Sequence, residues 1–313
     1  MPIAGNSFPM NWVLTVNDLL LNNADADDPE NYRVTRATHL LNAATFDGSL
    51  GPQTPLRHYL RYDVRPGKEG VADAGANGVF PRPARHIKRT WQLNNALGTL
   101  NVRSKRLQGL LVTTSVEVNG APQGIADATH YACYKVEPTH DVTFQTPDRG
   151  DGTGRFRRDI QALVDSPFFD DCAHLADGVT TSFGGTPAEG ACLFDVRAPV
   201  ELCNPVIQSD VLLPRTTSAT GIGSFTTSTT SLLCYEVRLA RKITSPTAAG
   251  VIGLPVGTKL DPMQAVHAAH NQRNGNPVQS VVASNFPGPV VFNTVRTDVA
   301  CVPTDVTGIV AGP

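Results

Sequence analysis

The sequence has little charge, few aromatic side chains and no long hydrophobic run. Only 17% of its 313 residues are charged and only 6% are aromatic. The net charge of −2 provides no excess of cations, so we expect no nucleic-acid or anionic-membrane partner. Because no run reaches the roughly 18 apolar residues that a membrane-spanning helix needs, we expect no membrane span.

Catalytic and targeting motifs are also missing. The chain contains no Cys-x-x-Cys pair, no Gly-x-Ser-x-Gly elbow and no phosphate-binding Gly-Lys-Ser/Thr sequence. Its most hydrophobic early segment, NWVLTVNDLLL (11–21), has neither a basic start nor a small-residue cleavage site, so it is not a signal peptide. The sequence therefore predicts a protein that is not an enzyme, and either a cytosolic chain or a mature exported one.

The residues that are abundant favour β structure. Glycine (27) and proline (24) are frequent, and 41% of the residues are hydrophobic. Short alternating segments separated by turn residues are typical of sandwiches and Greek-key folds. We expect an all-β protein built of tandem β-sandwich or Greek-key-like repeats. Short helical insertions are expected at 155–168 and 261–276.

One strand-like motif occurs three times. The copies are HYLRYDVRP (58–66), HYACYKVEP (130–138) and SLLCYEVRL (231–239). We expect each to open a repeat, because a periodicity of this kind marks a structural unit.

A second motif follows each copy and is expected to close the unit. The closing segments are LNVRSKRLQGLLV (100–112), FDVRAPVELCNPV (194–206) and FNTVRTDVACVP (292–303). The segment YRVTRATHLLNAA (32–44) resembles a closing segment without an opening one. The predicted organisation is a partial unit at 1–45, repeats at 46–118, 119–215 and 232–313, and a Thr/Ser-rich linker at 216–231.

The cysteines follow the repeats. Cys133 opens and Cys203 closes the second unit, whereas Cys234 opens and Cys301 closes the third. The first unit has Arg61 at the opening position and Gly109 near the closing one. The joint loss of both cysteines favours disulfide pairing within units, although free buried thiols and a metal site remain alternatives.

The two other cysteines, Cys172 and Cys192, lie in the insertion of the second unit, where they are expected to pair with each other.

The motif pair CYKV…LCNPV resembles an uncharacterised domain that occurs in tandem in secreted bacterial proteins. HYACYKVEP (130–138) and VELCNPV (200–206) carry the resemblance, and LNNALGTLNV (93–102) looks like a degraded middle motif. The resemblance covers about residues 32 to 303 and implies export, β structure and paired cysteines. It implies no catalytic activity, and the first unit departs from it because that unit lacks the cysteines.

Several polar clusters contain residue types that occur in functional sites. His267 and His270 lie three residues apart on the helix predicted at 261–276. They form either a metal site or a solvent-exposed histidine pair. Asp148 and Asp151 sit in DRGDGTG (148–154), which is read as a calcium loop, an adhesion tripeptide or a plain turn.

A second group, Cys172 with His174, offers a nucleophile only if the thiol is free. In each case the structural reading is preferred, so no catalytic residue, metal or cofactor is predicted.

The N-terminal segment is the predicted assembly strand. A partial first unit leaves a sheet edge unfilled, and an apolar strand from the same chain or from a neighbour can fill it. Its residues are Trp12, Val13, Leu14, Val16, Leu19 and Leu20. Donation between subunits would produce a head-to-tail homo-oligomer or polymer.

These features together predict a non-enzymatic extracellular or cell-surface structural protein that self-assembles into a filament or surface layer. The alternative is a secreted adhesion module whose insertions (139–193 and 240–290) present loops to a glycan or protein. An enzyme of unfamiliar type and a virus-like coat protein are weaker alternatives.

Overall fold

The computed structural model shows an all-β protein, as the composition predicts. It describes residues 13–18, 20, 30–41, 44–46, 58–66, 88–118, 121–123, 130–139, 160–165, 182–183, 186–187, 192–210, 230–260, 279–283, 289–292 and 298–311. The strands form a 14-stranded antiparallel sheet and a separate two-stranded one, β10 (Ser182–Phe183) with β11 (Thr186–Pro187).

A meander of long strands forms the centre of the sheet. Each strand pairs antiparallel with the next in chain order: β2 (Glu30–Leu41), β4 (His58–Pro66), β6 (Gly98–Val118), β8 (His130–Pro138), β12 (Cys192–Asp210), β13 (Ser231–Leu239) and β16 (Val299–Ala311). The three opening motifs are therefore β4, β8 and β13.

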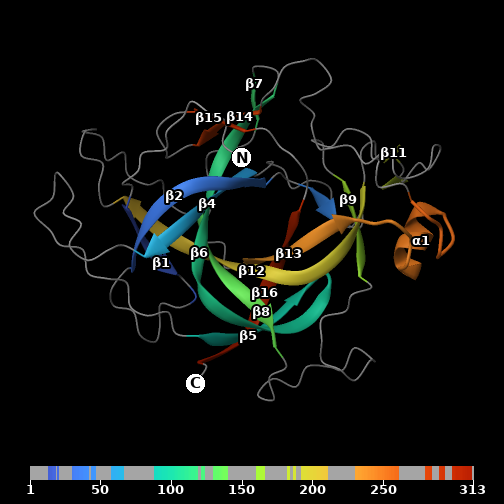
Figure 1. Ribbon diagram of the computed structural model, residues 1–313, viewed down its shortest axis with the longest axis horizontal. Coiled ribbons are helices and arrows are strands. Elements are labelled where there is room, and N and C mark those ends of the chain that lie inside the picture. Colours follow the sequence, from blue (N-terminus) through green and yellow to red (C-terminus); the bar gives the residue numbers. More distant parts are fainter. Residues whose placement is uncertain are drawn as a thin grey trace, which may run out of the picture.

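Two further strands close this meander into two rings. β1 (Val13–Asp18) pairs with both β2 and β12. The result is ring A, which consists of β1, β2, β4, β6, β8 and β12. β5 (Arg89–Asn95) pairs with both β6 and β16, which gives ring B: β5, β6, β8, β12, β13 and β16. Figure 1 shows the long, curved β6 and β12 that belong to both rings.

Each ring has its own hydrophobic core, because alternate residues of a strand point to the same face. The core of ring A gathers side chains from every strand of the ring, including Val16 of β1, Tyr62 of β4 and Tyr134 of β8. Tyr62 is completely buried. Val16, the middle of a six-residue strand, therefore attaches the N-terminal segment to the rest of the ring.

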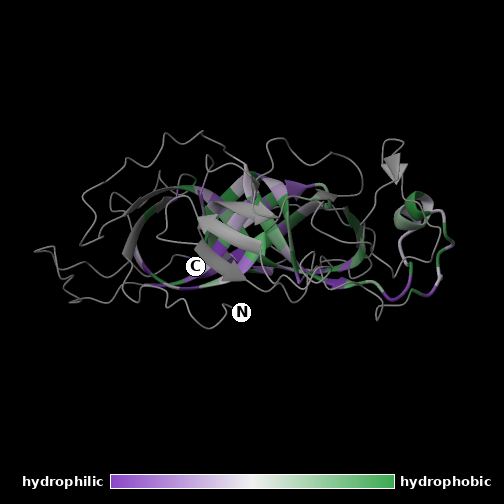
Figure 2. Cartoon of the chain, turned by 90° about the horizontal axis from the view of Figure 1, so that it is seen from above, coloured by the Kyte–Doolittle hydropathy of each residue, from purple (hydrophilic) through white to green (hydrophobic). Residues whose placement is uncertain are grey.

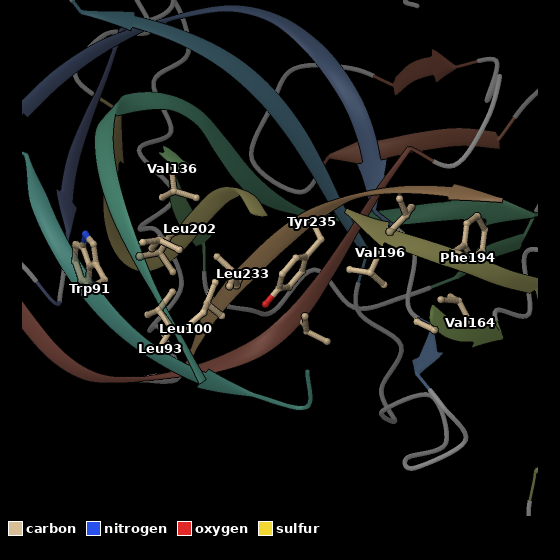
Figure 3. Close-up of a cluster of buried hydrophobic side chains, with 14 of the residues drawn as sticks. Trp91, Leu93, Leu100, Val136, Val164, Phe194, Val196, Leu202, Leu233 and Tyr235 are labelled. Atoms are coloured by element: carbon tan, nitrogen blue, oxygen red, sulfur yellow. The ribbon is translucent and has the colours of Figure 1, made fainter. Parts of the chain in front are cut away.

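The core of ring B is larger and contains a buried tryptophan. Figure 3 shows side chains of β5, β6, β12 and β13 pointing toward one another, among them Trp91, Leu93, Leu100, Leu202 and Leu233. Leucine and tryptophan side chains each gain roughly 1.5–3 kcal/mol or more from full burial. At one end of this core the Asn95 amide donates to the Tyr235 hydroxyl oxygen at 2.9 Å.

The β5–β6 hairpin lies where the sequence predicts two strand-like runs around Asn94-Asn95. Its register pairs Asn95 with Gly98 across a two-residue turn. Gly98 has a φ of 109°, which a residue without a Cβ adopts readily. The opening strands and the hairpin are thus confirmed as β structure.

The expected helix at 155–168 is wrong over its described part, since residues 161–165 form a strand, β9 (Gln161–Asp165). β9 pairs with β12 and with β3 (Thr45–Phe46). Ile160 and Val164, spaced by four, also fit a period of two, and the intervening Ala162 packs in the same ring B core. Pairing with β12 decides between the two periods. The expected helix at 261–276 lies outside the described residues.

The short strands β7 (Ala121–Gln123), β14 (Gln279–Ala283) and β15 (Pro289–Phe292) extend the far end of β6. β14 pairs with β15, as the two apolar runs around a Pro-Gly turn predict.

A short helix, α1 (Pro246–Ile252), contacts β9 (Figure 1). It is the coiled ribbon at one end of the molecule in Figure 2. Ser245 caps it by accepting a hydrogen bond from the Ala248 amide at 3.3 Å, and Gly253 ends it with a φ of 77°. Gln161 of β9 attaches this segment, because its side chain donates to the Lys242 carbonyl at 2.6 Å and accepts from the Thr244 amide at 2.7 Å.

Candidate functional site

The most concentrated polar and covalent chemistry in the described residues lies on the meander face opposite the ring cores. Side chains of β4, β6, β8, β12, β13 and β16 meet there in a mostly buried cluster. We call it the central cluster, defined by Tyr59, Leu111, Tyr131, Cys133, Cys203, Cys234 and the partly buried Cys301. The Tyr59 and Tyr131 rings, from equivalent positions of two opening strands, pack edge to face with their centroids 5.6 Å apart.

The strand registers place equivalent motif residues in equivalent places. Each opening strand pairs with the closing strand before it, so His39 faces Arg61, Gly109 faces Cys133, and Glu201 faces Cys234. The same alignment of closing strand against opening strand therefore recurs in three strand pairs: β2 with β4, β6 with β8, and β12 with β13.

On its other side each opening strand pairs with its own closing strand. Arg61 faces Leu111 there, and Cys234 faces Cys301. The residue that corresponds to the closing cysteines is thus Leu111, two positions after the expected Gly109.

Two disulfides cross the central cluster. Cys133 joins Cys203 over a separation of 70 residues, and Cys234 joins Cys301 over 67, each with Cα atoms 3.9 Å apart. These are the pairings that the repeats predict. The two bonds are neighbours, since the sulfurs of Cys203 and Cys234 lie 4.0 Å apart.

The third expected pairing is not tested by the described residues. Cys192 is disulfide-bonded, and Cys172 lies outside them.

Arg61 occupies in β4 the motif position that cysteine occupies in β8 and β13, and it forms a buried ion pair instead. Its guanidinium donates to both carboxylate oxygens of Glu201, with Nε to Oε2 at 2.9 Å. Nη1 also donates to Asp63 at 2.5 Å and to the Thr38 hydroxyl at 2.7 Å. Gln108 completes the network by donating to Glu201 at 2.6 Å. Arg61 and Glu201 are only 8% and 6% exposed.

Gly109 makes room for this arginine. A Cβ at Gly109 would come within 3.0 Å of the Arg61 guanidinium. A small residue is therefore required beneath the large one, which explains in physical terms why Arg61 and Gly109 occur together.

The ion network fixes the charge states of its members. Burial alone would lower the pKa of Arg61, but hydrogen bonds and attraction from Glu201 and then Asp63 raise the pKa overall. For Asp63, burial would raise the pKa, whereas Arg61 and Arg36 outweigh it and lower the pKa. Both groups are therefore charged throughout the neutral range, which suits structural contacts more than proton transfer.

His39 lies at the edge of this network. Its Nε2 is 3.8 Å from an Asp298 carboxylate oxygen, and both side chains are about one-third exposed or more. Burial, followed by repulsion from Arg61, lowers the pKa of His39, although Asp298, Glu201 and Asp63 oppose the shift. His39 and Asp298 thus connect β2 to the start of β16.

The repeated histidines at the start of the opening strands are core residues. His58 is completely buried and His130 is 3% exposed, and Ser231 at the equivalent position of β13 is also buried. Burial lowers the pKa of both histidines to about 4. They are neutral at pH 7, which suits a packing role.

The predicted assembly strand lies in the sheet of its own chain. Val13, Leu14 and Val16 belong to β1, between β2 and β12. Leu20 packs partly buried against the core of ring B. Trp12 and Leu19 lie outside the described residues.

A buried polar chain holds the end of β1. The Asn204 amide donates to the Asp18 carboxylate at 3.0 Å, and the Ser231 hydroxyl donates to the Asn204 side-chain oxygen at 3.0 Å. This chain links β1, β12 and β13.

Among the described residues, Cys133, Glu201 and Cys203 bring three potential metal-ligating atoms within 4.8 Å of one another. In the oxidised state the two sulfurs are joined to each other, so they are not thiolate ligands. The other candidate site residues of the sequence lie outside the described residues; they are Asp148, Asp151, Cys172, His174, His267 and His270.

The Arg61–Glu201 pair was not predicted from the sequence. The two residues are 140 positions apart, and only the substitution of a cysteine by an arginine hinted at a special role.

In the described part of the chain, no helix has the length and apolar character needed to cross a membrane. No protein-family model, curated protein or solved structure matches this chain.

Proposed function

We propose that this chain is a non-enzymatic, extracellular structural protein that self-assembles through β-strand contacts. The observation that carries the proposal is the position of β1. This short N-terminal strand completes ring A by pairing along both of its edges, with β2 and with β12. A strand of this kind fits the same slot of a neighbouring copy equally well, because the backbone hydrogen bonds are the same.

The tandem organisation supports an architectural role. The recurring registers of His39 with Arg61, Gly109 with Cys133, and Glu201 with Cys234 are what a repeated β-unit produces. We therefore propose that the chain consists of tandem sandwich-like units with the boundaries expected from the sequence.

The central cluster and the Arg61 ion network next to it also support a structural role. The charged groups of Arg61, Asp63 and Glu201 are hydrogen-bonded to one another rather than directed at a substrate. Buried disulfides with long loops stabilise a fold by restricting the unfolded chain, and they persist in oxidising surroundings. Both features suit an exported protein that must last outside the cell.

Deletion of residues 1–22 tests the proposal, and deletion of residues 1–11 is the matched control because it keeps β1 intact. We expect the full chain and the control to form filaments or layers in electron micrographs, and the longer deletion to remain dispersed. Assemblies that persist without residues 1–22 would rule out strand donation. A full chain that stays monomeric at all concentrations would rule out self-assembly.

One observation favours the alternative, an adhesion module. The segment around α1 belongs to an insertion predicted to present loops, and it exposes Val251 (40%) and Val256 (54%). Glycan-array binding that is lost on Val251→Ser with Val256→Ser, by a chain that remains monomeric, would support adhesion over assembly.

A further inference from the structure

A group of cations crosses four adjoining strands of ring A. β2, β4, β6 and β8 lie side by side in that order (Figure 1). Arg33 of β2 stands opposite Arg65 of β4, and Arg106 of β6 stands opposite Lys135 of β8. The last three side chains are exposed, and Arg33 is half-buried. We call these four residues the cationic patch.

The four side chains lie on one face of the sheet. Alternate residues of a strand share a face, so Arg65 lies on the face of Arg61, and Lys135 lies on the face of Cys133. Residues opposite each other in register also share a face, which adds the other two cations. The patch therefore continues the surface that holds the central cluster and the Arg61 ion network.

The carboxylates beside the patch are held by other cations. Asp63 contacts Arg36 at 3.0 Å and Arg61 at 2.5 Å, and Glu137 contacts Lys105 at 2.6 Å. In the part of the chain that the structure describes, the three exposed cations of the patch form no ion pair with a carboxylate. Their charges are thus available to an anion from outside.

Two like-charged pairs side by side also favour an external anion. Like charges directly opposite each other on neighbouring strands destabilise a sheet, and an anion between them relieves the repulsion. Guanidinium groups bind carboxylate and sulfate groups through two parallel hydrogen bonds. Because neighbouring strands are about 4.8 Å apart, the four strands spread the patch over roughly 15 Å, which is more than one small anion covers.

We propose that the cationic patch binds an anionic polysaccharide through the carboxylate or sulfate groups along its chain. The choice of a polysaccharide rests on the proposed extracellular location, because polymers of this class occur at cell surfaces.

The composition of the face favours a glycan over other polyanions. Bases of single-stranded nucleic acid stack on exposed aromatic rings, whereas the described aromatic side chains of β2, β4, β6 and β8 are all buried. A membrane surface is bound through exposed apolar side chains together with cations. The exposed large hydrophobic residues of the described chain lie elsewhere, in or near α1 and on β16; they are Val251, Val256 and Ile309.

The test measures binding of the full chain to immobilised heparin, polygalacturonate and neutral dextran by biolayer interferometry. We expect binding to the sulfated and the carboxylated glycan and none to dextran. Since salt screens exposed charges, the affinity should fall steeply between about 50 and 200 mM sodium chloride.

Matched variants make the result specific. Arg65→Glu with Lys135→Glu should weaken binding to both glycans about tenfold or more, and glutamine at the same positions should weaken it less. Lys242→Glu with Lys259→Glu is the control, because it makes the same change of charge at another pair of opposed lysines, close to α1. It should leave the affinity almost unchanged. Far-UV circular dichroism records whether each variant keeps its β structure.

Absence of binding to both glycans, or equal weakening by the patch variant and the control, would overturn the proposal. So would tighter binding of the full chain to single-stranded DNA or to phosphatidylserine vesicles than to either glycan. Light scattering on the same samples separates this result from self-assembly, since a monomeric chain can bind the glycans and an assembled one can fail to bind them.

Discussion

The first opening strand and the two later ones solve the same packing problem with different chemistry. In β8 and β13 a cysteine at the shared position forms a covalent bond to the closing strand. In β4 the same position holds Arg61, which reaches across the central cluster to Glu201 on β12. A disulfide fastens two neighbouring strands, β8 with β12 or β13 with β16, whereas the long arginine joins β4 to β12.

The difference also separates their sensitivities. The disulfides respond to the redox potential and hardly to pH, since neither sulfur titrates once bonded. The ion pair responds to the loss of either charge, because one buried charge without its partner is expensive.

Removal of both disulfides should have the largest effect. In the chain-entropy model, loops of 70 and 67 residues each contribute roughly 4 kcal/mol to the free energy of unfolding. We expect Cys133→Ala with Cys203→Ala, and Cys234→Ala with Cys301→Ala, each to lower stability by about that amount in urea titrations. A decrease in the free energy of unfolding below about 1 kcal/mol for both pairs would mean that the disulfides do not stabilise the fold.

Loss of Arg61 alone should come next. Arg61→Met leaves Glu201 buried without its partner, which costs about 3–5 kcal/mol. The double variant Arg61→Met with Glu201→Leu should lose less than the single one, because no isolated charge remains. Equal losses in the single and double variants would show that packing, rather than charge, holds β4 in place.

The repeated motifs predict the two disulfides but not the ion pair between Arg61 and Glu201. Repeated motifs were sufficient to pair Cys133 with Cys203, because both residues occur in matched segments. The Arg61–Glu201 contact depends on how far the meander curves, and no local pattern encodes that curvature. The closing equivalent, Leu111, also emerged only from the register, since bulges in β6 shift the alignment by two residues.

Local signals succeeded or failed for similar reasons. Alternation identified the opening strands and the β5–β6 hairpin, whose partners are close in sequence. The helix expected at 155–168 is a strand over its described part, because the burial of that part on both faces comes from β12 and α1. The α1 helix carries a legible Ser245-Pro246 start, but seven residues are too few for an apolar stripe to show.

Acid should weaken the fold through the equivalent histidines of β4 and β8. Their folded pKa, about 4, is depressed below the ordinary 6.5, so the unfolded chain binds more protons as the pH falls. Their contribution is complete above about pH 6.5 and is lost progressively toward pH 4. Urea titrations from pH 7 to 4 should show this decline, and His58→Gln with His130→Gln should flatten it. An unchanged slope in that variant would assign the decline to other groups.

The exposed end of the ion network should matter least. Arg36 is 68% exposed where it contacts Asp63 at 3.0 Å, so Arg36→Ala should change the free energy of unfolding by at most about 0.5–1 kcal/mol. The variant is thus the surface control for Arg61→Met. A loss as large as that of Arg61→Met would show that the network extends to the surface.

Strand donation by β1 can be measured most directly by cross-linking at a registered pair. Thr15 of β1 faces Ser209 of β12, so Thr15→Cys in one tagged chain and Ser209→Cys in a differently tagged chain mark the two sides of the slot. A chain carrying both substitutions is the control and should cross-link in any arrangement. After the two single variants are mixed, unfolded together and reassembled, we expect a disulfide between the two differently tagged chains. Cross-linking confined to the control, with assemblies present, would contradict it.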